Sequence, residues 1–168
     1  MKKLIASLFV LSVGFASAQT NAFKGKDDLK FQIGANMQDG GTGIMTSLDY
    51  GLGESFSLGV QAGYLLGVKE IAGTKPEFGD RFDVKARFNA NLGKVMNLPS
   101  NIDIYPGLNL GLKNFGGHLG ARYFFDKGFG LFTEMQFPIA KYNDKDKLFR
   151  NLNNQFAVNV GVSFDISK

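Results

Sequence analysis

The sequence of 168 residues contains no cysteine and no tryptophan, and it has one histidine and four prolines. The absence of cysteine excludes a disulfide framework, a thiol nucleophile and a cysteine-ligated metal site. Mean hydropathy is −0.06, and after the N-terminal segment no apolar run approaches the ~20 residues that a transmembrane helix needs. The composition also argues against disorder, because 17 phenylalanines and many aliphatic residues supply a core. The length fits one domain.

The first 18 residues have the pattern of a secretory signal peptide. Lys2 and Lys3 form a positive region, residues 4–15 are apolar, and residues 16–18 (ASA) are small. We therefore predict Sec-type export with cleavage before Gln19, followed by a polar lead-in over residues 19–27. Removal of the two lysines lowers the formal net charge from +4 to +2. No basic cluster remains in the mature chain, which argues against binding to nucleic acid.

Apolar and polar residues alternate along the mature chain. In the clearest segment the apolar set is Phe82, Val84, Ala86, Phe88, Ala90 and Leu92, and the polar set is Arg81, Asp83, Lys85, Arg87, Asn89 and Asn91. A period of two residues indicates a β-strand with two different faces. The expected strands are 28–38, 43–50, 56–65, 81–92, 102–112, 118–125, 129–139 and 156–166. Because no helical period of comparable length occurs, we predict an all-β fold, an eight-stranded antiparallel up-and-down barrel over residues 28–168.

The connections between these segments are unequal. The longest, 67–80 and 141–154, follow the third and seventh expected strands and therefore lie at the same end of the barrel. The connection 113–117 is short for that end. Pro106 lies within an expected strand, where it removes a backbone donor and predicts a bulge or a local break.

Alternation alone leaves open which face of the strands lines the inside of the barrel. Three features indicate that it is the polar face. It is rich in glycine, which suits a crowded interior. Its charged residues nearly balance, as buried ions must: Lys30, Arg81, Lys85, Arg87, Lys113 and Arg122 against Asp49, Asp83, Asp103, Glu134 and Asp165. Several apolar rows carry aromatic residues toward the strand ends, which is typical of belts at two membrane interfaces. We therefore predict a transmembrane barrel whose lumen holds a network of paired charges.

Residues 159–166 (NVGVSFDI) match the polar-x-Gly-x-x-apolar-x-apolar signal that directs outer-membrane barrels to insertion. With the eight-strand pattern, the chain resembles the small eight-stranded outer-membrane barrels of Gram-negative bacteria, of the OmpX and OmpA-transmembrane kind. On this resemblance the assembly signal comprises Asn159, Gly161, Phe164 and Ile166. Ile166 stands where an aromatic residue is usual, and two residues follow it.

Three longer stretches carry a second resemblance: PEFGDRFDVKARFNANLG, IYPGLNLGLKNFGGHLGARYFF and KGFGLFTE. They are similar to an uncharacterised barrel family from Bacteroidetes-type bacteria. That resemblance implies no established activity.

His118, the single histidine, is the strongest catalytic candidate. Pairing of Phe125 with Phe129 across a turn places Glu134 opposite Gly120 and diagonal to His118 and Arg122. Lipid A deacylases use a serine two residues after the histidine, and that position is Gly120 here. A base without a nucleophile is not an activated pair, so we favour a Glu134–Arg122 ion pair with His118 as a neighbouring hydrogen-bonding group.

Two other candidate sites are weak. Residues 143–146 (NDKD) lack the length and the closing glutamate of a calcium loop. Residues 39–43 (DGGTG) lack the Lys-Ser/Thr pair of a phosphate-binding loop. We therefore expect no cofactor and no metal site.

The sequence thus predicts a non-catalytic integral outer-membrane barrel with a structural or surface-interaction role through its long loops. The expected partners are outer-membrane lipid and the barrel-assembly machinery, and the expected state is a monomer. Two alternatives stay open. One is a soluble periplasmic barrel that binds an apolar ligand inside, and the other is a lipid A-modifying outer-membrane enzyme.

Overall fold

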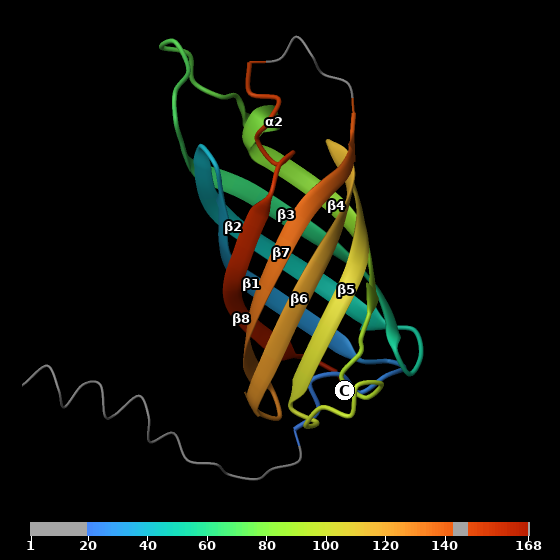
Figure 1. The fold of residues 1–168 in the computed structure, drawn as a ribbon. Coiled ribbons are helices and arrows are strands. Elements are labelled where there is room, and N and C mark those ends of the chain that lie inside the picture. Colours follow the sequence, from blue (N-terminus) through green and yellow to red (C-terminus); the bar gives the residue numbers. More distant parts are fainter. Residues whose placement is uncertain (1–19, 143–147, 168) are drawn as a thin grey trace, which may run out of the picture.

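The computed structural model describes residues 20–142 and 148–167, so the expected signal peptide over residues 1–18 lies outside the described residues. The described chain forms a closed barrel of eight antiparallel strands, each hydrogen-bonded to its neighbours in sequence (Figure 1). This confirms the predicted all-β, eight-stranded up-and-down barrel. No helix in these residues has the length and hydropathy to span a bilayer.

The strands are β1 (Leu29–Gln38), β2 (Gly41–Gly51), β3 (Phe56–Val68), β4 (Phe82–Ala90), β5 (Ile102–Gly111), β6 (Asn114–Asp126), β7 (Phe129–Lys141) and β8 (Ala157–Asp165). A short helix, α2 (Phe78–Arg81), precedes β4. Its capping box is formed by Glu77 and Asp80, a local pairing that stabilises a helix start. Arg81 therefore belongs to the helix and not, as expected, to the strand.

Strand β6 begins earlier than the sequence predicts, at Asn114. Gly116 and Gly117 were placed in the expected connection 113–117, but both lie within the strand, where a side chain on either would collide with β7. A Cβ at Gly117 would lie 2.8 Å from the ring of Phe137, and one at Gly116 would lie 2.6 Å from the Phe137 carbonyl oxygen. These glycines therefore allow close strand packing, and the connection between β5 and β6 shrinks to two residues.

The barrel closes where β1 meets β8, with paired residues from Lys30 and Asp165 to Gln38 and Ala157. Pro106 interrupts only one side of β5. The β5–β6 register passes through the Pro106–Leu119 pair without a shift, whereas the β4–β5 ladder ends at the Asn89–Gly107 pair. The predicted local break therefore lies between β4 and β5, where proline has no hydrogen to donate.

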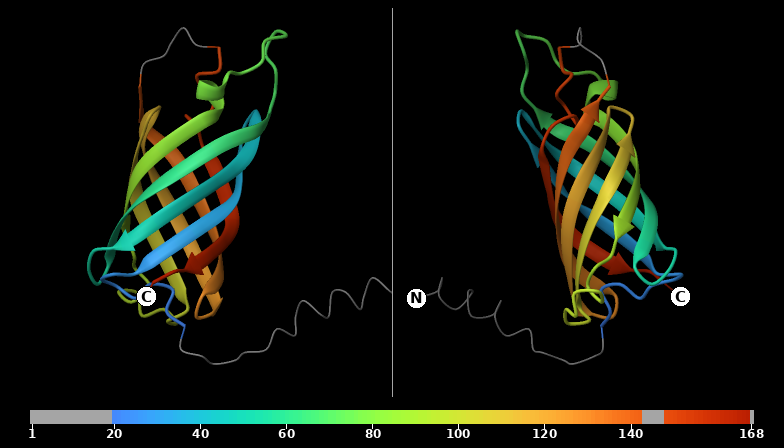
Figure 2. Two further views of the ribbon diagram at one scale, coloured as in Figure 1. Left: turned by 180° about the vertical axis from the view of Figure 1, so that it is seen from behind. Right: turned by 45° about the vertical axis from the view of Figure 1, so that its right-hand side comes forward.

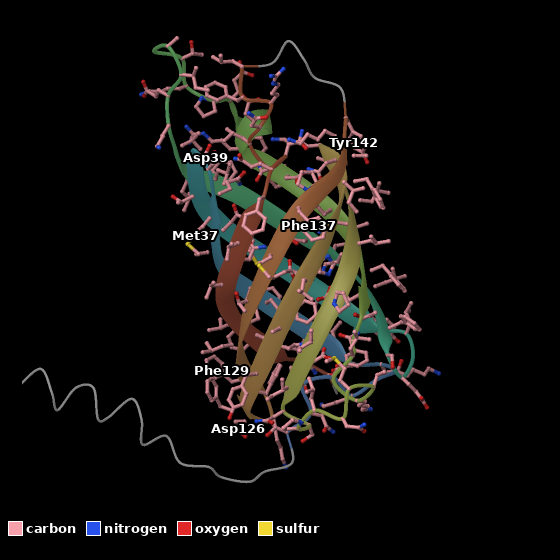
Figure 3. All side chains as sticks on the ribbon, viewed as in Figure 1. Met37, Asp39, Asp126, Phe129, Phe137 and Tyr142 are labelled. Carbon is pink, nitrogen blue, oxygen red and sulfur yellow. The ribbon has the colours of Figure 1, made fainter. Side chains whose placement is uncertain are left out.

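The two faces of the strands have opposite chemistry. Side chains such as Leu110, Val60 and Ile139 are more than half exposed on the outside, and Figure 3 shows Met37, Phe129 and Phe137 on the same outer surface. The largest fully buried side chains include Arg87, Arg122 and Lys30. The polar face is therefore the inside, and the outside is a continuous apolar band.

The two ends of the barrel are closed differently. At one end, here the turn end, lie both ends of the described chain and the connections that follow β2, β4 and β6 (Figures 1 and 2). At the opposite loop end, the connection after β3 extends beyond the strands (Figure 2). Phe149 and Leu152 of the second long connection pack on Leu65 and form an apolar plug over the lumen.

Candidate functional site

The centre of the lumen is held by one arginine that reaches two carboxylates on other strands. Arg87 of β4 lies 3.1 Å from Asp49 Oδ1 of β2 and 2.6 Å from Glu134 Oε2 of β7. All three side chains are buried. Buried ions of opposite charge in this geometry compensate each other's loss of water. Together with His118 they form the central cluster (Asp49, Arg87, His118 and Glu134).

His118 contacts an amide and a guanidinium. Its Nε2 lies 2.8 Å from Asn89 Oδ1 and 3.4 Å from Arg87 Nη2. Its Nδ1 has no hydrogen-bond partner among the described residues. Neither contact is the hydroxyl or thiol that a histidine base activates in nucleophilic catalysis.

The expected Glu134–Arg122 ion pair is wrong. Glu134 does lie opposite Gly120, although Phe129 pairs with Asp126 and a register shift separates this pair from the rest of the ladder. The space over Gly120 is occupied by the ring of Tyr105 from β5, and Arg122 stacks on that ring at 4.5 Å. Arg122 therefore turns to Asp103, while Glu134 crosses the lumen to Arg87.

Toward the turn end, the buried charges are closely paired. Arg122 donates to Asp103 Oδ2 at 2.9 Å and to Asn91. Lys30 lies 2.5 Å from Asp28 and 3.2 Å from Asp165. These residues form the turn-side cluster (Asp28, Lys30, Asp103, Arg122 and Asp165).

The lead-in folds back beneath this cluster. Lys24 lies 2.7 Å from Asp165 Oδ2, and Phe23 is buried with its ring 6.0 Å from the Arg122 guanidinium. The Ala22 amide donates to the Ser100 carbonyl. The lead-in therefore covers the turn end of the lumen.

The loop-side half of the lumen is more loosely paired. Lys85 Nζ lies 3.7 Å from Asp83 Oδ2 and donates instead to Gln136 at 2.8 Å. Both carboxylate oxygens of Asp83 are buried without a hydrogen-bond partner. A cavity of about 20 Å³ beside them is lined by amides, including Gln61 and Gln38. This volume holds about one water molecule.

Of the eleven charged residues expected on the polar face, nine lie inside the barrel. Lys113 lies instead in the connection between β5 and β6, where its Nζ donates to the Asp80 carbonyl. Arg81 is half-buried at the end of α2, and its Nε has no hydrogen-bond partner among residues 20–142 and 148–167. Lys24 of the lead-in and Asp28, the first residue of the expected strand 28–38, contribute to the ion pairs and were missed as lumen charges. A buried-charge argument could have suggested Asp28, because it directly precedes the first strand in the same alternation.

The residues of the expected assembly signal lie along the closing seam. Asn159 and Gly161 face the lumen from β8, while Phe164 stacks on Phe31 of β1. Gly161 pairs with Gly34, and a Cβ on either residue would overlap the backbone of the opposite strand. Ile166 follows β8 and is exposed, and its amide donates to the Leu29 carbonyl.

A larger groove lies at the loop end, between the two long connections. Its volume is about 350 Å³. Ile71, Leu148, Phe149 and Leu152 supply its apolar walls. Asp39, at the tip between β1 and β2 (Figure 3), is one of its polar residues. We call it the loop groove.

Chemically, the lumen is a packed polar core and the loop groove is open. Within residues 20–142 and 148–167, no three His, Asp or Glu side chains are grouped to hold a metal ion. The lumen side chains are committed mainly to one another, which is the usual state of an eight-stranded barrel. The loop groove is therefore the candidate site for a ligand from outside.

Comparisons with known proteins agree with the architecture. The chain is similar to a solved structure described as "De novo design of transmembrane beta-barrels", with 12% sequence identity and a TM-score of 0.55, covering 85% of this chain and 98% of that chain. At this identity the likeness concerns the fold alone. No curated protein matches the chain. A family model described as "Family of unknown function (DUF6646)" matches residues 12–166. The chain therefore belongs to this family of unknown function.

Proposed function

We propose that this protein is an exported, integral outer-membrane β-barrel of a Gram-negative, Bacteroidetes-type bacterium. Its interior is closed and non-catalytic, and its role is structural or depends on surface interactions of the long loops (67–80 and 141–154). The observation that carries the proposal is the inversion of the two faces, with an apolar band outside and paired charges inside. Residues 143–147 of the second loop lie outside the described residues.

The outer band fits lipid better than water. Soluble monomers rarely expose apolar patches larger than a few hundred Å², whereas here the outward rows of all eight strands are apolar. The strands are 9–13 residues long, and a tilted strand needs about 9–11 residues to cross the hydrocarbon core.

Aromatic rings gather near both ends of the band. At the turn end, Phe125 and Phe164 both contact Phe129, at 6.3 and 5.6 Å between ring centroids. At the loop end, Phe78 of α2 contacts Tyr64 and Phe82, at 5.5 and 5.3 Å. Rings with an apolar body suit the two boundaries between lipid and water.

The soluble carrier is less well supported, because it requires the apolar rows to line the inside. They lie outside, and the lumen contains charges and amides. The lipid A-modifying enzyme is less well supported because His118 contacts Asn89 and Arg87 and faces the lumen instead of the membrane. The same filled lumen argues against conduction.

We further propose that the protein is a monomer inserted by the barrel-assembly machinery, with residues 159–166 as its signal. Gly161, which faces the lumen, and Phe164, on the outer face of β8, support this proposal. The seam geometry gives Gly161 a second role, because it lets β8 approach β1 closely.

Membrane fractionation tests the proposal most directly. We expect the mature protein in the outer-membrane fraction, extractable only with detergent, with electrophoretic mobility that changes on heating. A water-soluble monomer would overturn it. We expect lipid A to stay unchanged when the wild type or His118→Ala is expressed. Modification of lipid A that requires the wild-type protein would instead favour the alternative of a lipid A-modifying enzyme. Planar bilayers should show no steady conductance.

A further inference from the structure

The loop groove combines apolar walls with a firm floor. Phe149 and Leu152 are 7% and 6% exposed and pack on the buried Leu65. Gly41 lies against the same floor, where an added Cβ would be 3.2 Å from Leu65. Ile71 and Leu148 are 42% and 50% exposed, so they offer apolar surface to a ligand. Burial of this surface would favour binding.

Hydrogen bonds to backbone carbonyls hold the rim in place. The Lys69 amide donates to the Gly40 carbonyl at 3.1 Å, and Gln155 Nε2 donates to the Asp39 carbonyl at 2.6 Å. Ile71 and Thr74 exchange two backbone hydrogen bonds around Ala72 and Gly73, which have φ angles of 50° and 77°. Two successive positive φ angles define a tight hairpin turn. Ala72 is a costly residue there, so the position of Ile71 is maintained against local strain.

Two side chains of opposite charge remain available on this rim. Glu70 pairs with Lys75 at 3.4 Å. The carboxylate of Asp39 and the ammonium of Lys69 are exposed, and neither has an ion-pair partner in the part of the chain that the structure describes. The groove thus presents one anion and one cation beside the same apolar walls.

We propose that the loop groove binds a short zwitterionic peptide with an apolar side chain. The ligand ammonium pairs with Asp39, its carboxylate pairs with Lys69, and its apolar side chain packs between Ile71 and Leu148 over Phe149. The volume of about 350 Å³ lies at the small end of the range for ligand sites, which suits a dipeptide. This proposal rests on the proposed function, in which the long loops face the medium outside the cell.

The absence of tryptophan from the protein makes a direct binding assay possible. The probe is the dipeptide Leu-Trp, whose fluorescence is followed as the detergent-folded full mature barrel is added. We expect a saturable change. Asp39→Asn, Lys69→Gln and Ile71→Ser should each weaken binding by about threefold to tenfold, as expected for a partly exposed charge contact or lost apolar contact.

Matched variants at the turn end control for general effects. Glu54, Lys127 and Leu52 are exposed there, so Glu54→Gln, Lys127→Gln and Leu52→Ser should leave the affinity unchanged. Each variant is first checked for heat-modifiable mobility, so that a barrel that has failed to fold is recognised separately from a loss of binding.

A blocked probe tests the charge assignment. N-acetyl-Leu-Trp-amide lacks both charges, so it should bind the wild type more weakly and should bind Asp39→Asn and Lys69→Gln as it binds the wild type. The proposal is overturned if Leu-Trp gives no saturable signal with correctly folded barrel, or if the turn-end variants weaken binding equally. Neither result would affect the membrane location, which fractionation decides by itself.

Discussion

The turn-side and loop-side halves of the lumen are built from similar residues but satisfy them differently. On the turn side, Arg122 and Asp103 are 2.9 Å apart, and Lys30 lies between Asp28 and Asp165. On the loop side, Lys85 and Asp83 are 3.7 Å apart, and the Asp83 carboxylate has no hydrogen-bond partner within the described residues. The two ends of the lumen are also closed differently, because the lead-in covers the turn end and the apolar plug covers the loop end.

This difference follows from where the chain ends meet. The lead-in and the residues after β8 converge at the turn end, so Lys24 and Ser167 both reach the carboxylates near the β1–β8 seam. The loop end has no such convergence and is covered by connections that also form the loop groove. We infer that ionic stabilisation is concentrated in the centre and the turn-side half, which leaves the loop end adaptable.

The largest effect is expected at the central cluster. Arg87→Met should lower the free energy of unfolding by about 3–5 kcal/mol, because it leaves the buried carboxylates of Asp49 and Glu134 without their cation. Urea unfolding in detergent micelles measures the change. Combining Arg87→Met with Asp49→Asn and Glu134→Gln should recover part of the loss. A loss below about 1 kcal/mol would mean that water already screens the centre, contrary to the burial argument.

The second prediction compares one carboxylate from each half. Asp103→Asn should cost about 3 kcal/mol, because the Arg122 guanidinium loses its buried counter-ion. Asp83→Asn should cost less than about 1 kcal/mol or should stabilise, because it removes a buried charge that accepts no hydrogen bond. The same urea series measures both. Equal losses would show that the two halves are equally ionic, and the comparison would fail.

The third prediction concerns the seam. Gly161→Ala should destabilise the barrel by about 2 kcal/mol, since its Cβ would overlap the Ile33 carbonyl and force β8 away from β1. Gly53→Ala is the control, because nothing lies within 4 Å of a Cβ there. Refolding of purified protein, followed by heat-modifiable mobility, measures closure without the assembly machinery. If Gly161→Ala refolded normally in vitro but inserted poorly in cells, Gly161 would act mainly in recognition by the assembly machinery.

The sequence predicted the strands well because each face of the barrel meets its own environment. Period two in the residues around Phe82–Ala90 directly reflects an apolar outside and a polar inside. The start of β6 was missed, because Gly116 and Gly117 have the composition of a turn but provide room under Phe137. Glycine composition alone does not separate these two uses.

The pairings inside the lumen were not predictable from strand register. The pairing of neighbouring strands suggested an ion pair between Glu134 and Arg122. Long side chains instead cross the lumen, and the Tyr105 ring occupies the space over Gly120 between these two residues, so that Glu134 pairs with Arg87. The contacts of Phe23 and Lys24 depend on the position of the lead-in across the turn end of the closed barrel, which strand register does not specify. The loop groove likewise exists only because two connections far apart in sequence meet.

The smallest expected effect is the difference in stabilisation between two ion pairs, one at each end of the barrel. Lys24 and Asp165 are 2.7 Å apart with the carboxylate 2% exposed, whereas Lys75 and Glu70 are 3.4 Å apart with 73% and 49% of their side chains exposed. Lys24→Ala should therefore cost about 1 kcal/mol and Lys75→Ala about 0–0.5 kcal/mol, as exposed pairs do. Urea unfolding at low and high salt measures both, and added salt should reduce the small Lys75 effect proportionally more. If Lys75→Ala proved the costlier change, the loop end would be the more strongly held end, and the assignment of adaptability to it would have to be reversed.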